Sequence, residues 1–188
     1  MSVLKHDKFG APVYIDEVPA EQWQRVRAIR LDTLSEAPYA FGSTYENELQ
    51  QPESWWRQRL VDGRWFIARD GDDDVCLTML MQAPIPESFE SNGSLPIAVG
   101  DELPWIRSVW TRPEARGRHI IDALMLHVCD QVAEQGIDFT VLGVRAGNER
   151  AHAAYLRMGF SDVGTFIPSS ASVEQPNWLM ARPSDTQR

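Results

Sequence analysis

A short basic segment, Arg116-Gly117-Arg118, lies between a predicted strand and a predicted helix. Arginine side chains donate charge-assisted hydrogen bonds to anions, and glycine lets the backbone turn tightly. The first amides of a helix have no partner within the helix, and the helix dipole adds partial positive charge there. The segment therefore favours a phosphate-binding loop, since the dipole disfavours cations at a helix start. The alternative is that both arginines are solvated surface side chains.

Three other residues, Asn148, Ala151 and Tyr155, lie at helical spacing ahead of Gly159. Asn148 suits a helix N-cap, which uses its side-chain oxygen and leaves the amide NH₂ free for a ligand. Tyr155 belongs to the apolar stripe of this helix, and an aromatic residue in such a position is most often part of the core. From the pattern alone, Tyr155 is therefore expected to be a core residue.

Apolar periodicity indicates the elements that position these two sets. Strands are expected at 13–18, 64–70, 74–82, 105–111, 139–145, 160–167 and 175–182. Helices are expected from Pro19 to about Ser35, as a short helix before Pro52, from Pro52 to about Val61, over 117–135 and after Asn148. The 117–135 helix is apolar at Ile121, Leu124, Met125, Val128 and Val132. This helix joins two strands as a crossover and makes them parallel, whereas the hairpins give antiparallel pairs, so the sheet is mixed.

The composition limits the possible partners. The chain has 188 residues, with 18 basic and 27 acidic side chains and a net charge of −9. This sign disfavours nucleic acid as a partner and favours cationic molecules such as amines. No apolar run reaches the length of a membrane span and no signal peptide is evident, so we expect a cytoplasmic protein without membrane contact. Cys76 and Cys129 are expected to be buried thiols, and no metal site is expected, because the aspartates near residue 72 lack calcium-loop spacing.

Two segments resemble the GCN5-related N-acetyltransferase (GNAT) family. The first, SVWTRPEARGRHIIDALM, is similar to the family's acetyl-coenzyme A segment: a strand, a proline, then R-x-x-G-x-G/A at a helix start. The second, LGVRAGNERAHAAYLRMGF, has Asn148, Ala151, Tyr155 and Gly159-Phe160 at the family's spacing. AIRLDTLSEAPYAFGSTYENEL resembles the family's substrate-side helices more loosely. The resemblance covers residues 105–165 and the order of elements throughout.

The resemblance implies an α/β fold of the mixed α+β type. Its central sheet would be mixed and mostly antiparallel, with one splayed parallel strand pair and helices on both faces. It implies a single domain over residues 1–188, in which residues 84–103 form a long loop or insertion. A loop of that length is usually functional or disordered.

The resemblance also implies acetyl-coenzyme A as co-substrate. Its pyrophosphate would bind the main-chain amides between Arg116 and Asp122, and its pantetheine arm would add along residues 109–111 like an extra strand. His119 and Ile121 stand where the family has glycine. Either the cradle is tighter or shifted and still binds coenzyme A, or it is too crowded to bind. The cofactor-binding residues implied are Val109, Trp110, Thr111, Arg116, Gly117, Arg118, His119, Ile120, Ile121, Asp122, Asn148, Ala151 and Tyr155.

Acetyl transfer to an amine needs three further groups. The backbone N–H of Val109 is the implied oxyanion donor, and Tyr155 is the implied general acid for the thiolate. A base must take a proton from the ammonium form of the acceptor, and Glu102 is the candidate that we select. Asp101, Glu46, Glu48 and a water molecule are alternatives, whereas His152 is expected to point away from Tyr155.

The sequence therefore predicts an N-acetyltransferase that acts on a primary amine of a small molecule or peptide, as a monomer or homodimer. A non-catalytic acyl-coenzyme A sensor or scaffold with a degenerate loop is one alternative, and the loss of two glycines motivates it. A protein N-terminal acetyltransferase is another. The tryptophans at 55, 56, 105 and 110 are expected to be packing residues more than acceptor-pocket residues.

Overall fold

The computed structural model describes residues 2–168 and 176–184, which divide into two compact units. The first unit comprises Met1–Met81 with Ser108–His127, and the second comprises Gln82–Arg107 with Val128–Arg188. The predicted single domain over residues 1–188 stays a prediction, because this division does not decide it. Within the described residues, no helix is both long enough and apolar enough to cross a membrane.

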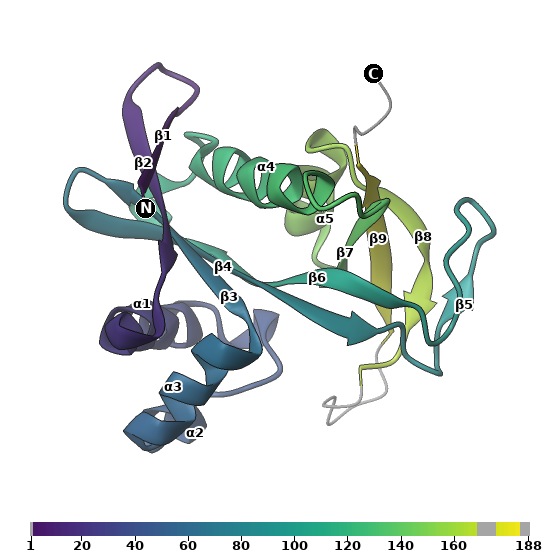
Figure 1. Cartoon of the computed structure of the whole chain (residues 1–188), viewed down its shortest axis with the longest axis horizontal. Helices are drawn as coiled ribbons and strands as arrows, with labels where there is room; N and C mark the ends of the chain where they lie inside the picture. The colour runs from purple at the N-terminus through teal and green to yellow at the C-terminus, as the bar shows by residue number, and fades with distance from the viewer. Residues whose placement is uncertain (1, 169–175, 185–188) are drawn as a thin grey trace. The chain divides into compact units, whose positions relative to one another are not determined.

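The first unit contains a four-stranded antiparallel arrangement in the order β1-β2-β3-β4. Figure 1 shows α1, α2 and α3 gathered on one side of its strands. The elements are β1 (Ser2–His6), β2 (Pro12–Val18), α1 (Trp23–Glu36), α2 (Tyr45–Leu49), α3 (Glu53–Asp62), β3 (Arg64–Asp70), most of β4 (Asp73–Pro84), the end of β6 (Glu102–Thr111), the first turns of α4 (Ile120–Ala133), and short 3₁₀ helices at Ala20–Gln22, Pro38–Ala40 and Pro113–Ala115.

Successive side chains of β3 point to opposite faces of the sheet, and in the first unit a helix packs against each face. Trp65 and Ile67 of β3 belong to an apolar cluster with Val26 and Ile29 of α1. Phe66 lies between them in the strand, so it points to the opposite face, where its ring meets His127 of α4 edge-on. The expected helices on both faces are therefore present in this unit.

The β1 strand was not predicted from the sequence. Its residues alternate between exposed and half-buried, and none is fully buried. A strand at the edge of a sheet with this burial lacks the apolar alternation by which a strand is recognised. Backbone pairing with β2, from Ser2 opposite Asp16 to His6 opposite Pro12, defines it instead.

The second unit contains the strand order β6-β7-β9-β8-β5. Its parallel ladder joins Trp105 to Val141 and Ile106 to Leu142, which confirms the predicted crossover geometry. The other pairings are antiparallel, so the sheet is mixed and mostly antiparallel as expected. The remaining elements are β5 (Glu90–Ser91), β7 (Phe139–Arg145), α5 (Glu149–Arg157), β8 (Ser161–Phe166) and β9 (Asn177–Pro183).

The long segment 84–103 is anchored within the second unit. Its ends are joined by two backbone hydrogen bonds, from Ile85 N–H to Asp101 O and from Gly100 N–H to Ile85 O, each 2.9 Å long. β5 pairs with β8 through Glu90 opposite Thr165. The C-terminal strands are consequently not free edges, since β9 lies between β7 and β8, and β8 carries β5.

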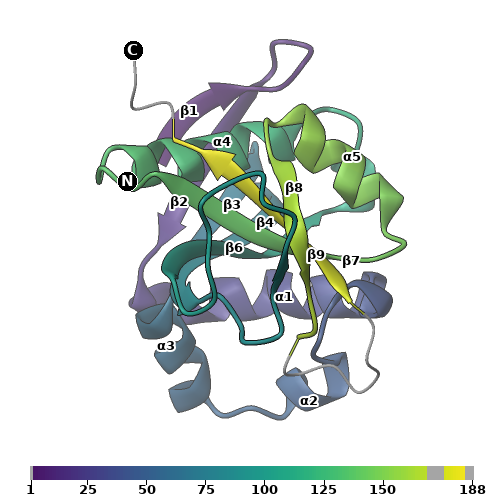
Figure 2. The same cartoon turned by 90° about the vertical axis from the view of Figure 1, so that its right-hand side faces the viewer.

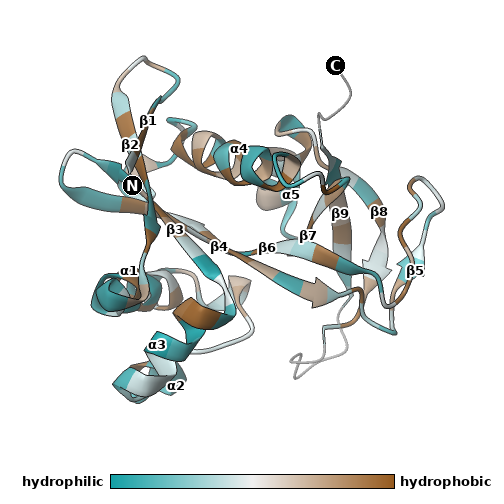
Figure 3. Ribbon diagram, in the orientation of Figure 1, coloured by the Kyte–Doolittle hydropathy of each residue, from teal (hydrophilic) through white to brown (hydrophobic). Residues whose placement is uncertain are grey.

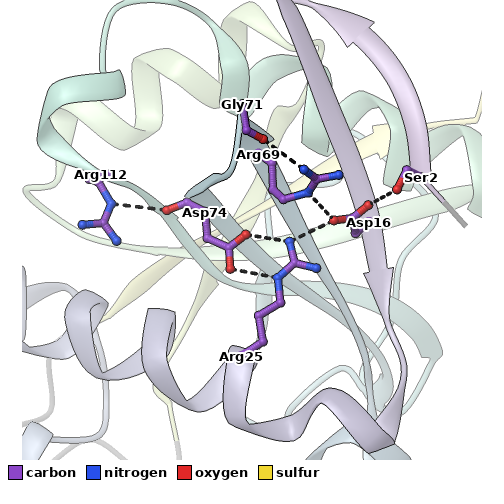
Figure 4. A network of polar contacts seen from close by, with 7 residues as sticks. All are labelled: Ser2, Asp16, Arg25, Arg69, Gly71, Asp74 and Arg112. Carbon is purple, nitrogen blue, oxygen red and sulfur yellow. Dashed lines mark hydrogen bonds and ion pairs between the residues drawn. The ribbon is translucent and has the colours of Figure 1, made fainter.

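A network of ion pairs joins the strands and α1 of the first unit (Figure 4). Asp16 of β2 accepts hydrogen bonds from Ser2, from Arg69 Nε at 2.8 Å and from Arg25 at 2.9 Å. The Arg25 guanidinium also donates to both carboxylate oxygens of Asp74, at 2.8 and 2.6 Å. Burial by itself raises the pKa of Asp16, but the three donors outweigh it and lower the pKa to about 2.

We expect Asp16→Asn to lower the free energy of unfolding by about 1–3 kcal/mol at pH 7, because an amide cannot balance two guanidinium groups. An aspartate in the unfolded chain has a pKa of about 3.9. The lowered folded-state pKa means that the contribution of Asp16 is present above about pH 4 and is lost as the pH falls through about 2. Urea unfolding between pH 7 and pH 2 would show the two proteins converging in acid.

Glu53→Gln is the matched control, since the Glu53–Arg57 pair is exposed, at 56% and 45% for the two side chains. This change should cost less than about 0.5 kcal/mol. If Asp16→Asn cost no more than the control, the network would not contribute to stability.

Candidate functional site

The loop between β6 and α4 turns through two residues in the left-handed region. Gly117 has φ +77° and His119 has φ +63°. A β-carbon added at Gly117 would meet nothing within 4 Å, so the backbone conformation, and not a lack of space, favours glycine there. Histidine thus occupies a position where the family has glycine and keeps the backbone conformation that glycine adopts easily.

The main-chain amides of this loop are directed away from internal partners. The carbonyl of His119 accepts from the N–H groups of Asp122 and Ala123, at 3.1 and 3.3 Å, which closes the first turn of α4. Among the described residues, none accepts a hydrogen bond from the N–H groups of residues 117–121. A run of free amides ahead of a helix is an arrangement that binds a phosphate group.

The Arg116 side chain contacts two elements of the first unit, the end of β6 and the end of α1. Its Nε donates to the carbonyl of Thr111 at 3.0 Å, and its terminal nitrogen forms an ion pair with Glu36, the last residue of α1. The same oxygen of Glu36 accepts the indole N–H of Trp110 at 2.9 Å. Glu36 therefore joins the end of α1 to the loop and to β6, which the sequence gave no reason to expect.

Arg118 is held by two carboxylates. Its guanidinium donates to Asp7 at 2.7 Å and also pairs with Asp70 at the end of β3. The hydrogen bond from Arg118 lowers the pKa of Asp7 despite the opposing effect of burial. Asp7 also accepts from the N–H groups of Phe9 and Ala11, so it organises the β1–β2 turn, and Lys8 N–H donates to the carbonyl of Arg118 at 3.0 Å.

The two bulky residues at family glycine positions lie differently from each other. His119 Nδ1 lies 2.9 Å from a carboxylate oxygen of Asp122, and the imidazole is 39% exposed. Ile121 is half-buried, whereas Ile120 is buried and begins the apolar stripe of α4. The stripe predicted to start at Ile121 is therefore displaced by one residue, and it continues through Leu124, Met125, Val128 and Val132 as expected. Figure 3 shows the apolar segments recurring along α4.

The end of β6 contains the residues predicted to contact the pantetheine arm. Ser108 has φ +56°, which interrupts the extended backbone immediately before Val109. Val109 is half-buried, and Trp110 is buried. Thr111 Oγ1 lies 3.5 Å from Cys76 Sγ, and burial raises the pKa of this thiol to about 12, so Cys76 remains protonated at neutral pH. Sequence reasoning missed Ser108, because serine gives no signal for a left-handed backbone.

Helix α5 presents the second predicted set. Asn148 accepts from the N–H of Ala151 at 3.2 Å, which confirms the predicted N-cap. Tyr155 is buried, with its ring edge-on to Phe160, and burial raises the pKa of its phenol. His152 is bound by the Asp162 carboxylate at 2.9 Å and lies against Trp178 of β9. Figure 2 shows α5 beside β8.

The candidate bases differ in their surroundings. Glu102 is exposed at the start of β6, and Glu46 is exposed in α2. Asp101 accepts from the N–H of Ala98 at 2.8 Å. Glu48 is buried and binds Arg30 through both carboxylate oxygens, at 3.1 and 2.9 Å. Glu48 is thus engaged in a buried ion pair, while the structure leaves Glu102 as a solvent-facing carboxylate.

Known proteins share both the sequence pattern and the fold. Residues 23–160 match the acetyltransferase (GNAT) family. The chain belongs to the GNAT family. No match was found among curated proteins.

Solved structures of GNAT proteins align with almost the whole chain. The GNAT domain of S. lividans PAT has a TM-score of 0.69 at 14% identity, covering 97% of this chain and 96% of that one. The RimL ribosomal L7/L12 alpha-N-protein acetyltransferase, in complex with coenzyme A, has a TM-score of 0.68 at 11% identity, covering 93% and 96%. A ribosomal-protein-alanine N-acetyltransferase from Brucella melitensis has a TM-score of 0.62 at 19% identity, covering 90% and 98%. At these identities the likeness shows the GNAT fold.

We expect His119→Gly in this GNAT protein to leave stability unchanged or to raise it by up to about 1 kcal/mol, because glycine adopts positive φ without steric cost. His119→Val should lower it by about 1–2 kcal/mol, since a β-branched residue is disfavoured in that region. Thermal unfolding of the three proteins tests this. Equal stability of the valine variant would show that the loop conformation is not fixed at residue 119.

Asn148 has two roles that two variants separate. Asn148→Ala should cost about 1 kcal/mol of stability, since it removes the cap of α5. Asn148→Asp keeps a capping oxygen and removes only the NH₂ donors. If Asn148 also contacts coenzyme A, both variants should weaken binding in calorimetry. Unchanged affinity in Asn148→Asp would restrict Asn148 to capping.

Proposed function

We propose that this GNAT protein transfers the acetyl group of acetyl-coenzyme A to a primary amine of a small molecule or peptide. The observation that supports this most directly is that the N–H groups of residues 117–121, in the loop and at the start of α4, have no acceptor among the described residues. His119 keeps the left-handed turn in this run, so the substitution of the family glycine preserves the direction of the backbone. The amides bind the pyrophosphate, and no metal takes part in the proposed reaction.

In the proposed reaction the neutral amine attacks the thioester carbonyl directly. A C–N bond forms, the C–S bond breaks after a tetrahedral intermediate, and the amine loses one proton. The Val109 N–H stabilises the oxyanion, and the Tyr155 phenol, which is protonated at neutral pH, protonates the leaving thiolate. Glu102 or water takes the amine proton. The cofactor contacts along residues 109–111 and at Ala151 belong to this proposal.

Two alternatives have support of different kinds. His119 and Ile121, at positions where the family has glycine, motivate a sensor or scaffold that binds acyl-coenzyme A without turnover. The activities of the two ribosomal-protein acetyltransferases with a similar fold motivate protein N-termini as acceptors. The cytoplasmic location and the monomeric or homodimeric state stay predictions.

One experiment separates these functions. The protein is titrated with acetyl-coenzyme A in a calorimeter, then incubated with acetyl-coenzyme A and a panel of small amines and peptides while free thiol is measured. Binding with thiol release that depends on an acceptor supports the transferase. Binding without release from any acceptor supports the sensor, and absence of binding contradicts both.

We expect Tyr155→Phe to lower kcat by about 10²-fold, the scale of a lost general acid. Phenylalanine fills the same buried volume, so the melting temperature and the affinity for coenzyme A should change little. Stopped-flow measurement of thiol release tests the change in kcat. If the variant kept full turnover, Tyr155 would be a core residue of α5 and not the acid.

A further inference from the structure

Carboxylates outnumber guanidinium groups around the Arg116-Gly117-Arg118 segment. Arg116 and Arg118 are its cations, and both are paired in the structure. The carboxylates that contact the loop come from Asp7, Glu36, Asp70 and Asp122. A pyrophosphate that binds next to four carboxylates and two neutralised arginines meets unfavourable like charge. For either arginine to contact the pyrophosphate, its ion pair must first open.

The two arginines differ in how easily they are released. Arg118 is bound by two carboxylates, and the Asp7 side chain is only 1% exposed. Opening that pair would leave a buried carboxylate without its cation, which is costly. Among the described residues, Arg116 pairs with one carboxylate, that of Glu36, and both side chains are partly in water, at 25% and 29% exposure. An ion pair of that kind contributes little to stability and exchanges partners readily.

The position of the Glu36 carboxylate is electrostatically unfavourable. It is the last residue of α1, where the helix dipole disfavours an anion. Its oxygen holds Arg116 and the Trp110 indole at the same time. The indole hydrogen bond keeps the carboxylate beside β6 when Arg116 leaves.

We infer that Glu36 is an internal counter-anion of the cofactor site, which occupies Arg116 in the free protein and is exchanged for the pyrophosphate of coenzyme A. This inference rests on the proposed binding of coenzyme A to the loop. Glu36 lowers the affinity for the cofactor, because the ion pair must open before Arg116 binds phosphate. Glu36 is the last residue of α1, so the exchange takes place where the chain leaves this helix.

The test is the affinity of Glu36→Gln for coenzyme A. Glutamine still accepts the Trp110 N–H but no longer carries the charge that holds Arg116. We expect the Kd for coenzyme A to fall about twofold to fivefold, the scale of a partly exposed ion pair. Pantetheine, which lacks the pyrophosphate, should bind both proteins equally. An unchanged or higher Kd for coenzyme A would overturn the inference, and so would an equal gain for pantetheine.

Two further proteins control this comparison. Asp32→Asn removes a carboxylate from the same helix that pairs with Arg112 at 2.8 Å, and it should leave the Kd unchanged. In an Arg116→Gln background, Glu36→Gln should have no effect, because the partner is already gone. A persistent gain there would contradict exchange through Arg116.

The failure of this inference is distinguishable from failure of the proposed function. Tighter binding by Glu36→Gln without thiol release would contradict the transferase and support the counter-anion. Thiol release with an unchanged Kd in Glu36→Gln would do the reverse. No binding of coenzyme A by the natural protein would overturn both.

Discussion

The direction of the backbone at residues 117–119 is the constraint on which the site depends. The chain must leave β6, turn through two left-handed residues and enter α4 with its amides unpaired. Glycine satisfies the first turn at no cost, while histidine satisfies the second at a steric cost. The contact with Asp122 and the closure of the first helical turn on His119 O compensate for it. The contacts of His119 with Asp122 and with the first turn of α4 thus maintain the loop conformation more than the intrinsic preference of a histidine does.

The ion pairs around the loop anchor it to other elements of the first unit, and this role is at least as important as ligand binding. Arg118 fastens the loop to the β1–β2 turn and to the end of β3, and Arg116 fastens it to α1. An arginine that is prominent in a sequence motif is therefore not automatically a free ligand-binding group. Its availability depends on carboxylates that are distant in the sequence.

Local patterns predicted most of the fold and part of the site. The parallel pair, helix α4 and the Asn148 cap follow from periodicity, crossover geometry and capping chemistry, and the structure confirms them. The partners of Arg116 and Arg118 were not predictable, because Glu36 and Asp7 lie 80 and 111 residues earlier in the chain. The left-handed Ser108 and the burial of Ile120 in place of Ile121 also depend on tertiary packing.

The β1–β2 turn helps to hold the loop between β6 and α4 in place. Asp7 and the N–H of Lys8 both contact Arg118, so two residues at the beginning of the chain hold a loop made much later. Contacts over such sequence separations form late in folding, because a long loop must close before they are gained. During synthesis, Asp7 and Lys8 cannot form their contacts with Arg118 until residue 118 has left the ribosome.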